Sequence, residues 1–282
     1  MAIKILIDSA SDMSLKEAQD LGVYFLPMEI RFGNEEYLDG VNLLPEEFYD
    51  KLIESDVMPQ TSQINPFRWE EEFNKLTADG SQVIAITISS KLSGTYTSAC
   101  VAAEKFKDKV FVLDSMSAAV GERHLCYYAI ELVKKGLSIA DIMAELEEKK
   151  GKLRIMAMLG TLEYLRRGGR ISAAVALAGS LLSIKPVVAV IDGEVKLIGK
   201  AMGSKKANNL LTSFIEKSGG IDFDMPVSVI WSGKDKSLLD KYVEDNAKIW
   251  QDYRGELPYY QIGSTIGTHV GPGAIGVCFF EK

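Results

Sequence analysis

One of only two histidines in this chain of 282 residues lies in a glycine-rich stretch near the end of the sequence. His269 is surrounded by five glycines and one proline between positions 263 and 276. Glycine lets the backbone approach another group closely and adopt positive φ angles that other residues resist. An imidazole can bind an anion or act as a general base near neutral pH. His269 is therefore the first candidate for a side chain with a chemical role, in a loop that can reach another part of the protein.

Hydroxyl groups follow the most apolar predicted strand, at 83–88. The run Ser-Ser-Lys-Leu-Ser-Gly-Thr-Tyr at 89–96 leaves this strand and enters a helix that continues through 99–106. Open α/β sheets bind ligands at the carboxyl ends of their strands, and free N–H groups at a helix start favour an anion. Ser93, Gly94 and Thr95 are thus candidates for an anion site, with the alternative that Ser93 only caps the helix.

Two further polar segments are weaker candidates. Thr61 and Ser62 lie in a predicted loop after Pro59, where hydroxyls often satisfy only the local backbone. Asp8 follows the first strand, at 3–7, and could orient a hydroxyl or His269, or simply stabilise its own turn.

Three arginines surround a glycine pair at 168–169. A helix that ends at Gly168 would favour Arg166 and Arg167 through its dipole alone. Arg170 lacks that explanation, and it could bind phosphate or the carboxylates of a partner in bidentate fashion.

Composition excludes several classes of partner and site. The chain is acidic, with a formal net charge of −7 and a pI near 5.1, which disfavours binding to nucleic acid. The longest apolar stretch, at 171–184, is too short to cross a bilayer, and the first residues are too short a run for a signal peptide. We expect a cytoplasmic protein without stable membrane insertion.

The remaining reactive side chains predict no metal site and no disulfide. Cys100, Cys126 and Cys278 lack CxxC spacing and are interpreted as buried thiols. His124 lies in the middle of a predicted helix, where packing or a surface role is the expected use. The sequence also lacks the short motifs of α/β-hydrolases, P-loop kinases, zinc proteases and dinucleotide enzymes.

Alternation of strands and helices predicts a three-layer α/β/α domain with a mainly parallel sheet over residues 1–155. The expected strands are 3–7, 23–32, 83–88 and 110–113, and the expected helices are a short one from Ser14 to Gly22, then 45–54, 66–77, 121–135 and 139–150.

After residue 155 the pattern changes to strands that pair locally, typical of a two-layer α+β domain over residues 156–282. Asp192-Gly193 predicts a hairpin turn between two strands. The expected strands are 186–191, 194–199, 227–231, 258–262 and 275–280, and the expected helices are 173–183, 205–217 and 237–250.

Taken together, six segments in this order resemble the DegV family of fatty-acid-binding proteins along nearly the whole chain. They lie at 8–12, 59–63, 89–96, 165–172, 184–186 and 266–273.

The resemblance implies a non-catalytic two-domain protein that buries a long-chain fatty acid of the palmitate, stearate or oleate type and needs no cofactor. It implies that Thr61, Ser93 and His269 hold the carboxylate, with Ser62, Gly94 and Thr95 nearby. It also implies a partner, a fatty acid kinase that converts the bound carboxylate to an acyl phosphate. Arg166, Arg167 and chiefly Arg170 are then candidates for docking that kinase.

Two alternatives stay open at this point. In the first, His269 activates Ser93 for attack on an acyl ester or thioester, which would make the protein an acyl hydrolase or transferase. In the second, the lipid is only structural, and the arginine segment belongs to a regulatory module.

Overall fold

The computed structural model describes residues 2–172 and 184–282. Its first sheet is wholly parallel and has the strand order β2-β1-β6-β7 in space. The strands are β1 (Ile3–Asp8), β2 (Tyr24–Leu26), β6 (Gln82–Thr87) and β7 (Val110–Asp114). Val83, Ile84 and Ile86 are fully buried, as the continuous apolar run of this strand predicts for a sheet covered on both faces.

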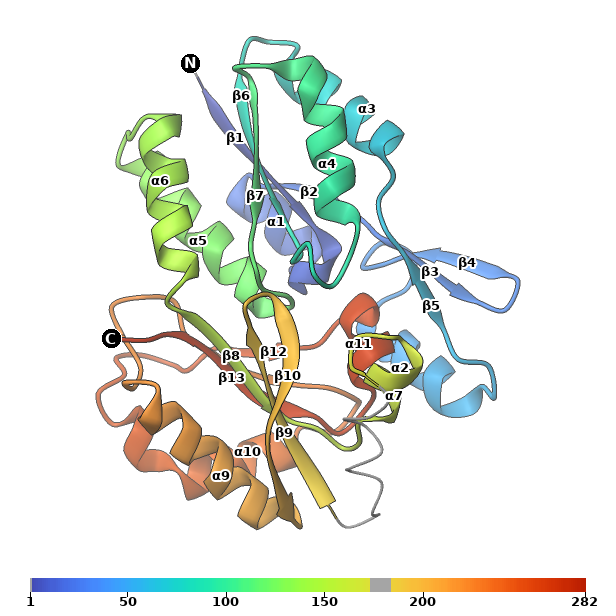
Figure 1. Ribbon diagram of the computed structural model, residues 1–282, viewed down its shortest axis with the longest axis vertical. Coiled ribbons are helices and arrows are strands. Elements are labelled where there is room, and N and C mark those ends of the chain that lie inside the picture. Colours follow the sequence, from blue (N-terminus) through green and yellow to red (C-terminus); the bar gives the residue numbers. More distant parts are fainter. Residues whose placement is uncertain (1, 173–183) are drawn as a thin grey trace.

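Helices lie on both sides of the parallel sheet (Figure 1). One side carries α3 (Pro66–Thr77) and α4 (Thr95–Ala103), which pack against each other, and the other carries α5 (Val120–Lys134) and α6 (Ile139–Lys150). Helix α1 (Leu15–Leu21) packs near β2, and short 3-10 turns occupy Ser9–Ser11 and Glu104–Phe106. The predicted three-layer α/β/α arrangement is confirmed.

The expected strand at 23–32 is wrong, because the segment divides at Pro27 into two strands of different sheets. Proline has no N–H to donate to a strand ladder, and the next N–H, of Met28, bonds instead to Ser9 Oγ at 2.9 Å. After this break the chain pairs in a small antiparallel sheet of order β4-β3-β5. Its strands are β3 (Glu29–Phe32), β4 (Glu35–Leu38) and β5 (Gln60–Ser62), with α2 (Pro45–Glu54) between β4 and β5 in sequence.

The rest of the chain builds a larger, mostly antiparallel sheet of order β10-β9-β8-β13-β11-β12. Its strands are β8 (Leu153–Met158), β9 (Ile184–Ile191), β10 (Glu194–Met202), β11 (Ser228–Trp231), β12 (Tyr259–Gln261) and β13 (Ile275–Phe280). Helices α9 (Ser204–Lys217) and α10 (Ser237–Asp245) cover one face (Figure 1). The expected helix at 237–250 ends early, and Ala247–Trp250 is a 3-10 turn.

Strand β13 shows why the large sheet is apolar on both faces. Ile275, Val277 and Phe279 pack with the helix-covered core, whereas Cys278 and Phe280 belong to the core shared with the parallel sheet. The two sheets are therefore joined by a continuous apolar core.

Two further helices contact each other beside this core, α7 (Glu163–Arg167) and α11 (Ser264–Val270). The expected loop around His269 is wrong, because this stretch forms α11. Gly267 permits the helix to pack closely, since a Cβ there would lie 2.7 Å from the ring of Phe48, and Gly271 ends it with a φ of +69°.

The expected helix at 173–183 lies outside the described residues. Across 2–172 and 184–282, no helix is both long and apolar enough to span a bilayer.

Candidate functional site

A cavity of about 270 Å³ lies where the carboxyl ends of the parallel strands meet the large sheet. Ile88 and Ala118 line it from the segments that follow β6 and β7, and Ile155 and Val188 line it from β8 and β9. This is the edge of an open α/β sheet at which ligands bind. The sequence prediction of a site at this edge is consistent with the position of the cavity.

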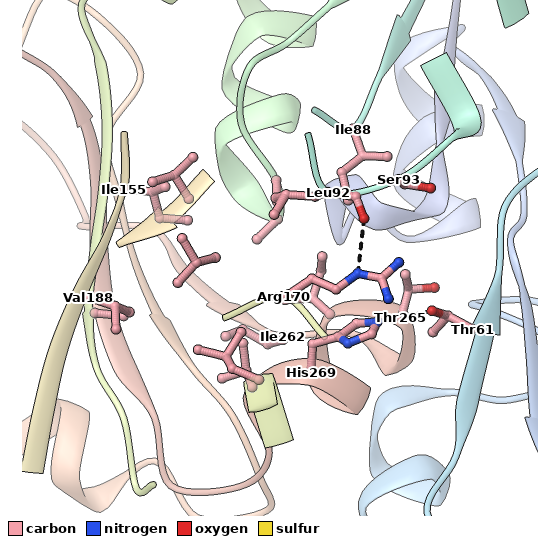
Figure 2. A pocket seen from close by; sticks show the side chains of 18 of the residues that line it. Thr61, Ile88, Leu92, Ser93, Ile155, Arg170, Val188, Ile262, Thr265 and His269 are labelled. Carbon is pink, nitrogen blue, oxygen red and sulfur yellow. Dashed lines mark hydrogen bonds between the residues drawn. The ribbon is translucent and has the colours of Figure 1, made fainter. Parts of the chain in front are cut away.

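The cavity has an apolar end and a polar end (Figure 2). Ile155 and Val188 lie at one end, and the polar side chains gather at the other. The polar side chains that line the cavity are those of Thr61, Gln63, Ser93, Arg170, Thr265 and His269. A cavity of this kind suits a ligand with a long apolar part and one polar group.

Thr61 and His269 form the best-defined polar contact at this end. Strand β5 supplies Thr61 and α11 supplies His269, and Thr61 Oγ1 lies 3.0 Å from His269 Nε2. His269 Nδ1 is buried and makes no hydrogen bond in the described part of the chain. Gly168 packs against this side of the ring, because a Cβ on Gly168 would lie 2.1 Å from Nδ1.

Burial lowers the pKa of His269 to about 4, with a smaller contribution from the positive charge of Arg170. The imidazole is therefore neutral at pH 7. An unpaired buried N–H is rarer in proteins than an unpaired acceptor, so the tautomer protonated on Nε2 fits this site better. In that tautomer His269 donates to Thr61, which leaves the Thr61 hydroxyl hydrogen free to donate to a ligand.

Ser93 has two roles in this geometry. It lines the cavity, and its Oγ lies 2.9 Å from Thr95 Oγ1 and accepts from the Thr95 N–H at 3.3 Å. The helix starts one residue later than a Ser93 cap predicts, since Gly94 occupies the N-cap position of α4. The hydroxyl thus both satisfies the local backbone and faces the cavity.

Gly94 and Thr95 support this segment differently. Gly94 lines the cavity, and a Cβ there would lie 1.9 Å from Gln63 Oε1, so only glycine lets Gln63 lie across it. Thr95 is fully buried behind Ser93 and accepts from the Ile64 N–H at 3.3 Å. It does not line the cavity.

The structure does not bring Ser62 to the cavity. Successive side chains of a strand point to opposite faces, so Ser62 points away where Thr61 points in, and it is exposed. The prediction placed this pair in a loop, whereas the segment is strand β5, paired to Ile30 through Thr61. The sequence shows no sign of a strand here, because all three residues of β5 are polar and show no alternation of apolar and polar side chains.

Arg170 lies in the cavity wall, not on a fully exposed docking surface. Its Nε donates to the Leu92 carbonyl at 3.0 Å (Figure 2), and its Nη1 donates to the Gly168 carbonyl at 2.6 Å. Burial lowers the pKa of this guanidinium from its usual value, although an arginine stays charged. Arg170 therefore places a positive charge beside His269.

Arg166 and Arg167 are exposed and lie outside the cavity. Both pair with Glu163 at 2.6 Å on α7. Their position at the end of this helix agrees with the dipole explanation.

Thr265 was missed by the sequence analysis. It lines the cavity and precedes His269 by one helical turn, so the two share a face of α11. The spacing of four was visible in the sequence, but the glycines on either side suggested a loop.

Asp8 and His124 prove to be structural. Asp8 accepts from the N–H groups of Ala10 and Ile88 at 2.8 and 2.9 Å. It therefore fixes the end of β6 and does not orient His269. His124 is buried, with its Nε2 3.0 Å from Ser228 Oγ, and burial lowers its pKa to about 3. Packing, one of the two expected uses of His124, is what the structure shows.

The hydrogen bonds do not form a serine–histidine dyad. His269 Nε2 faces Thr61, and Ser93 faces Thr95. A nucleophilic serine needs its base within hydrogen-bond reach, so this geometry does not favour the acyl hydrolase alternative.

Cys126 and Cys278 are buried thiols, and Cys100 is partly exposed. In the part of the chain that the structure describes, no group of three or more His, Cys, Asp or Glu side chains could hold a metal ion.

Comparisons of the sequence and of the structure with known proteins point to the same protein family. The family model described as an uncharacterised protein of the DegV family matches residues 2–282. The chain belongs to the DegV family. A DegV domain-containing protein of Caldanaerobacter subterraneus subsp. tengcongensis is 35% identical over 284 residues, covering 99% of both chains. The resemblance inferred from the six segments is thus confirmed.

Solved DegV structures share the whole fold. A fatty-acid-binding DegV family protein from Thermus thermophilus superposes with a TM-score of 0.89 at 30% identity over 100% of both chains. A stearic acid-binding protein from Eubacterium ventriosum superposes with a TM-score of 0.86 at 27% identity over 100% of this chain and 99% of the other. Both of these solved proteins are fatty-acid-binding proteins.

Proposed function

We propose that this protein binds one long-chain fatty acid, with the acyl chain in the cavity and the carboxylate at its polar end. The observation that carries the proposal is the division of a single cavity into an apolar end and a cluster of Thr61, Ser93, His269 and Arg170. The fatty acids carried by related structures agree with this chemistry.

The polar end supplies donors suited to a carboxylate. Thr61 and Ser93 offer hydroxyl groups, and the neutral His269 orients Thr61 through its Nε2. Hydrogen bonds to an ionised group contribute about 1.5–3 kcal/mol each. The guanidinium of Arg170 adds a positive charge at the same end, whereas the sequence predicted for it the binding of phosphate or of a partner's carboxylates.

Chain burial supplies most of the affinity. About 15 methylenes at about 0.8 kcal/mol each give roughly 12 kcal/mol, before the loss of ligand freedom reduces the total. Submicromolar dissociation constants are thus within reach.

The proposal includes presentation of the carboxylate to a fatty acid kinase. The family resemblance motivates this partner, and the exposed Arg166 and Arg167 belong to the same segment as Arg170, which lines the cavity. The kinase would phosphorylate the carboxylate to an acyl phosphate while the acyl chain stays buried. The chain itself would then contribute binding and orientation, with no covalent step of its own.

A titration tests the binding step. The delipidated protein is titrated with oleate and palmitate, and a dissociation constant below about 10 μM is expected from the affinity argument. Failure to bind either acid at that level would exclude the proposal. A second assay, with the kinase, ATP and loaded protein, should yield acyl phosphate, and Arg166→Ala should reduce the yield without weakening oleate binding.

A further inference from the structure

Helix α11 begins against two carboxylates from a distant part of the chain. The Gly263 N–H donates to Asp12 Oδ1 at 2.9 Å. The N–H groups of Ser264 and Thr265 donate to the two oxygens of Asp39 at 3.2 and 3.3 Å. Three consecutive backbone donors are thus satisfied by two acids that lie more than 220 residues away in sequence.

These acids replace a cap that the helix lacks. Gly263 occupies the N-cap position, has no side chain to accept a hydrogen bond, and lets Asp12 approach, since a Cβ there would lie 3.0 Å from Asp12 Oδ1. A helix of seven residues is not stable alone. The first N–H groups of a helix have no acceptor within the helix, so the carboxyl oxygens of the two acids both satisfy and stabilise the start of α11.

The backbone of each acid is held by a hydrogen bond to another part of the chain. Asp39 is 3% exposed, and its own N–H donates to the Met28 carbonyl at 3.0 Å. The Asp12 carbonyl accepts from Arg123 Nη1 at 3.0 Å, and this guanidinium lies 3.6 Å from the ring centre of Tyr260, just before α11.

The same short helix carries cavity residues at both of its ends. Thr265, whose N–H bonds to Asp39, lies in the first turn, and His269 lies in the last. A displacement of the first turn would therefore also move His269 at the other end of the helix and change its 3.0 Å contact with Thr61.

We infer that Asp39, assisted by Asp12, is a positioning residue for the head-group end of the cavity. It acts through α11, which it fixes in place, and it does not touch the ligand. The consequence for ligand binding rests on the proposed function, whereas the consequence for His269 does not.

Two histidines make the test direct. The imidazole resonances of the ligand-free protein are recorded for wild type, Asp39→Asn, Asp12→Asn and Ser228→Ala, and a His269→Gln spectrum assigns the two signals. Ser228→Ala is the matched control, because it deletes a buried hydrogen bond to His124 from strand β11 and removes none of the hydrogen bonds at the start of α11. Both aspartate variants should move the His269 signal, Asp39→Asn should leave the His124 signal in place, and Ser228→Ala should move the His124 signal and leave that of His269.

A ligand comparison completes the test. Asp39→Asn should weaken oleate binding by about tenfold, the order expected for disturbing hydrogen bonds to a charged group. It should change the affinity for oleyl alcohol, which has the same chain without the carboxylate, much less. An unmoved His269 signal in both folded aspartate variants, or equal losses for acid and alcohol, would overturn the inference. If wild type binds no oleate, the proposed function fails, while the His269 signals still decide the positioning role.

Discussion

Replacement of Thr61 by valine tests the head-group site most sharply. The change exchanges a hydroxyl for a methyl of similar size in strand β5, so the cavity keeps its shape. It removes the partner of His269 Nε2 at 3.0 Å. Since Nδ1 already lacks a partner, the imidazole would then have no hydrogen bond among those of the described residues.

The substitution should change both the affinity for oleate and the free energy of unfolding. A lost hydrogen bond to an ionised carboxylate costs about 1.5–3 kcal/mol, which corresponds to a roughly 10- to 150-fold weaker dissociation constant for oleate. A buried imidazole nitrogen without a partner costs about 1–3 kcal/mol in the free energy of unfolding of the ligand-free protein. The affinity for oleyl alcohol should fall less than that for oleate.

The assay is a fluorescence titration of delipidated protein, with urea unfolding in parallel. Thr61→Ser keeps the hydroxyl and should retain most of the affinity. Ser62→Ala, the exposed neighbour on the same strand, should bind oleate as wild type does. If Thr61→Val binds oleate within about twofold of wild type, a loss smaller than one neutral hydrogen bond gives, the reasoning is refuted.

Three further predictions use the same site. The pKa of His269 is lowered from 6.5 to about 4, so its neutral form stabilises the fold above pH 6.5, and this stabilisation is lost as the pH falls towards 4. Between pH 7 and pH 5 the free energy of unfolding in urea should therefore fall by about 2 kcal/mol more in wild type than in His269→Gln. Equal losses in the two proteins would contradict the lowered pKa. Arg170→Ala should weaken oleate binding as well as acyl phosphate formation, whereas Arg166→Ala should affect only the latter; unchanged oleate affinity in Arg170→Ala would return that residue to a docking role. Gly168→Ala should displace the His269 ring, because the added Cβ would lie 2.1 Å from Nδ1, and an unshifted His269 imidazole resonance would show that the ring does not pack there.

Helices with strong local signals were predictable from sequence. The helices Pro45–Glu54, Pro66–Thr77 and Ile139–Lys150 have the predicted bounds. Proline at the first helical position or a capping Asn65 or Ser138 defines their starts, and these signals depend on a few adjacent residues.

Elements that depend on distant partners were not predictable. Strand β5 is polar and exists because it pairs with β3. Helix α11 looks like a loop in sequence, and it forms because Asp12 and Asp39 satisfy its first N–H groups. No local pattern connects these two acids to a helix near the other end of the chain.

In the candidate site, too, some residues could be predicted from the sequence and others only from the fold. Thr61, Ser93 and His269 were selected from sequence and line one cavity, and Gly94 lines it as well. The place of Arg170 in the cavity wall was missed because the sequence shows only an arginine without a helix-end role, which fits an exposed docking residue as well as a buried one. Its position beside His269 follows from the contact of α7 with α11, which only the fold brings together.

Whether this cavity holds a fatty acid can be decided by lipid analysis of the protein as purified. The native protein is extracted with organic solvent, and the extract is analysed by mass spectrometry, with a Thr61→Val, His269→Gln double variant prepared in parallel. We expect about one long-chain fatty acid per wild-type chain and a much lower content in the double variant. A wild-type extract without fatty acid, from a protein that also fails to take up added oleate, would contradict it.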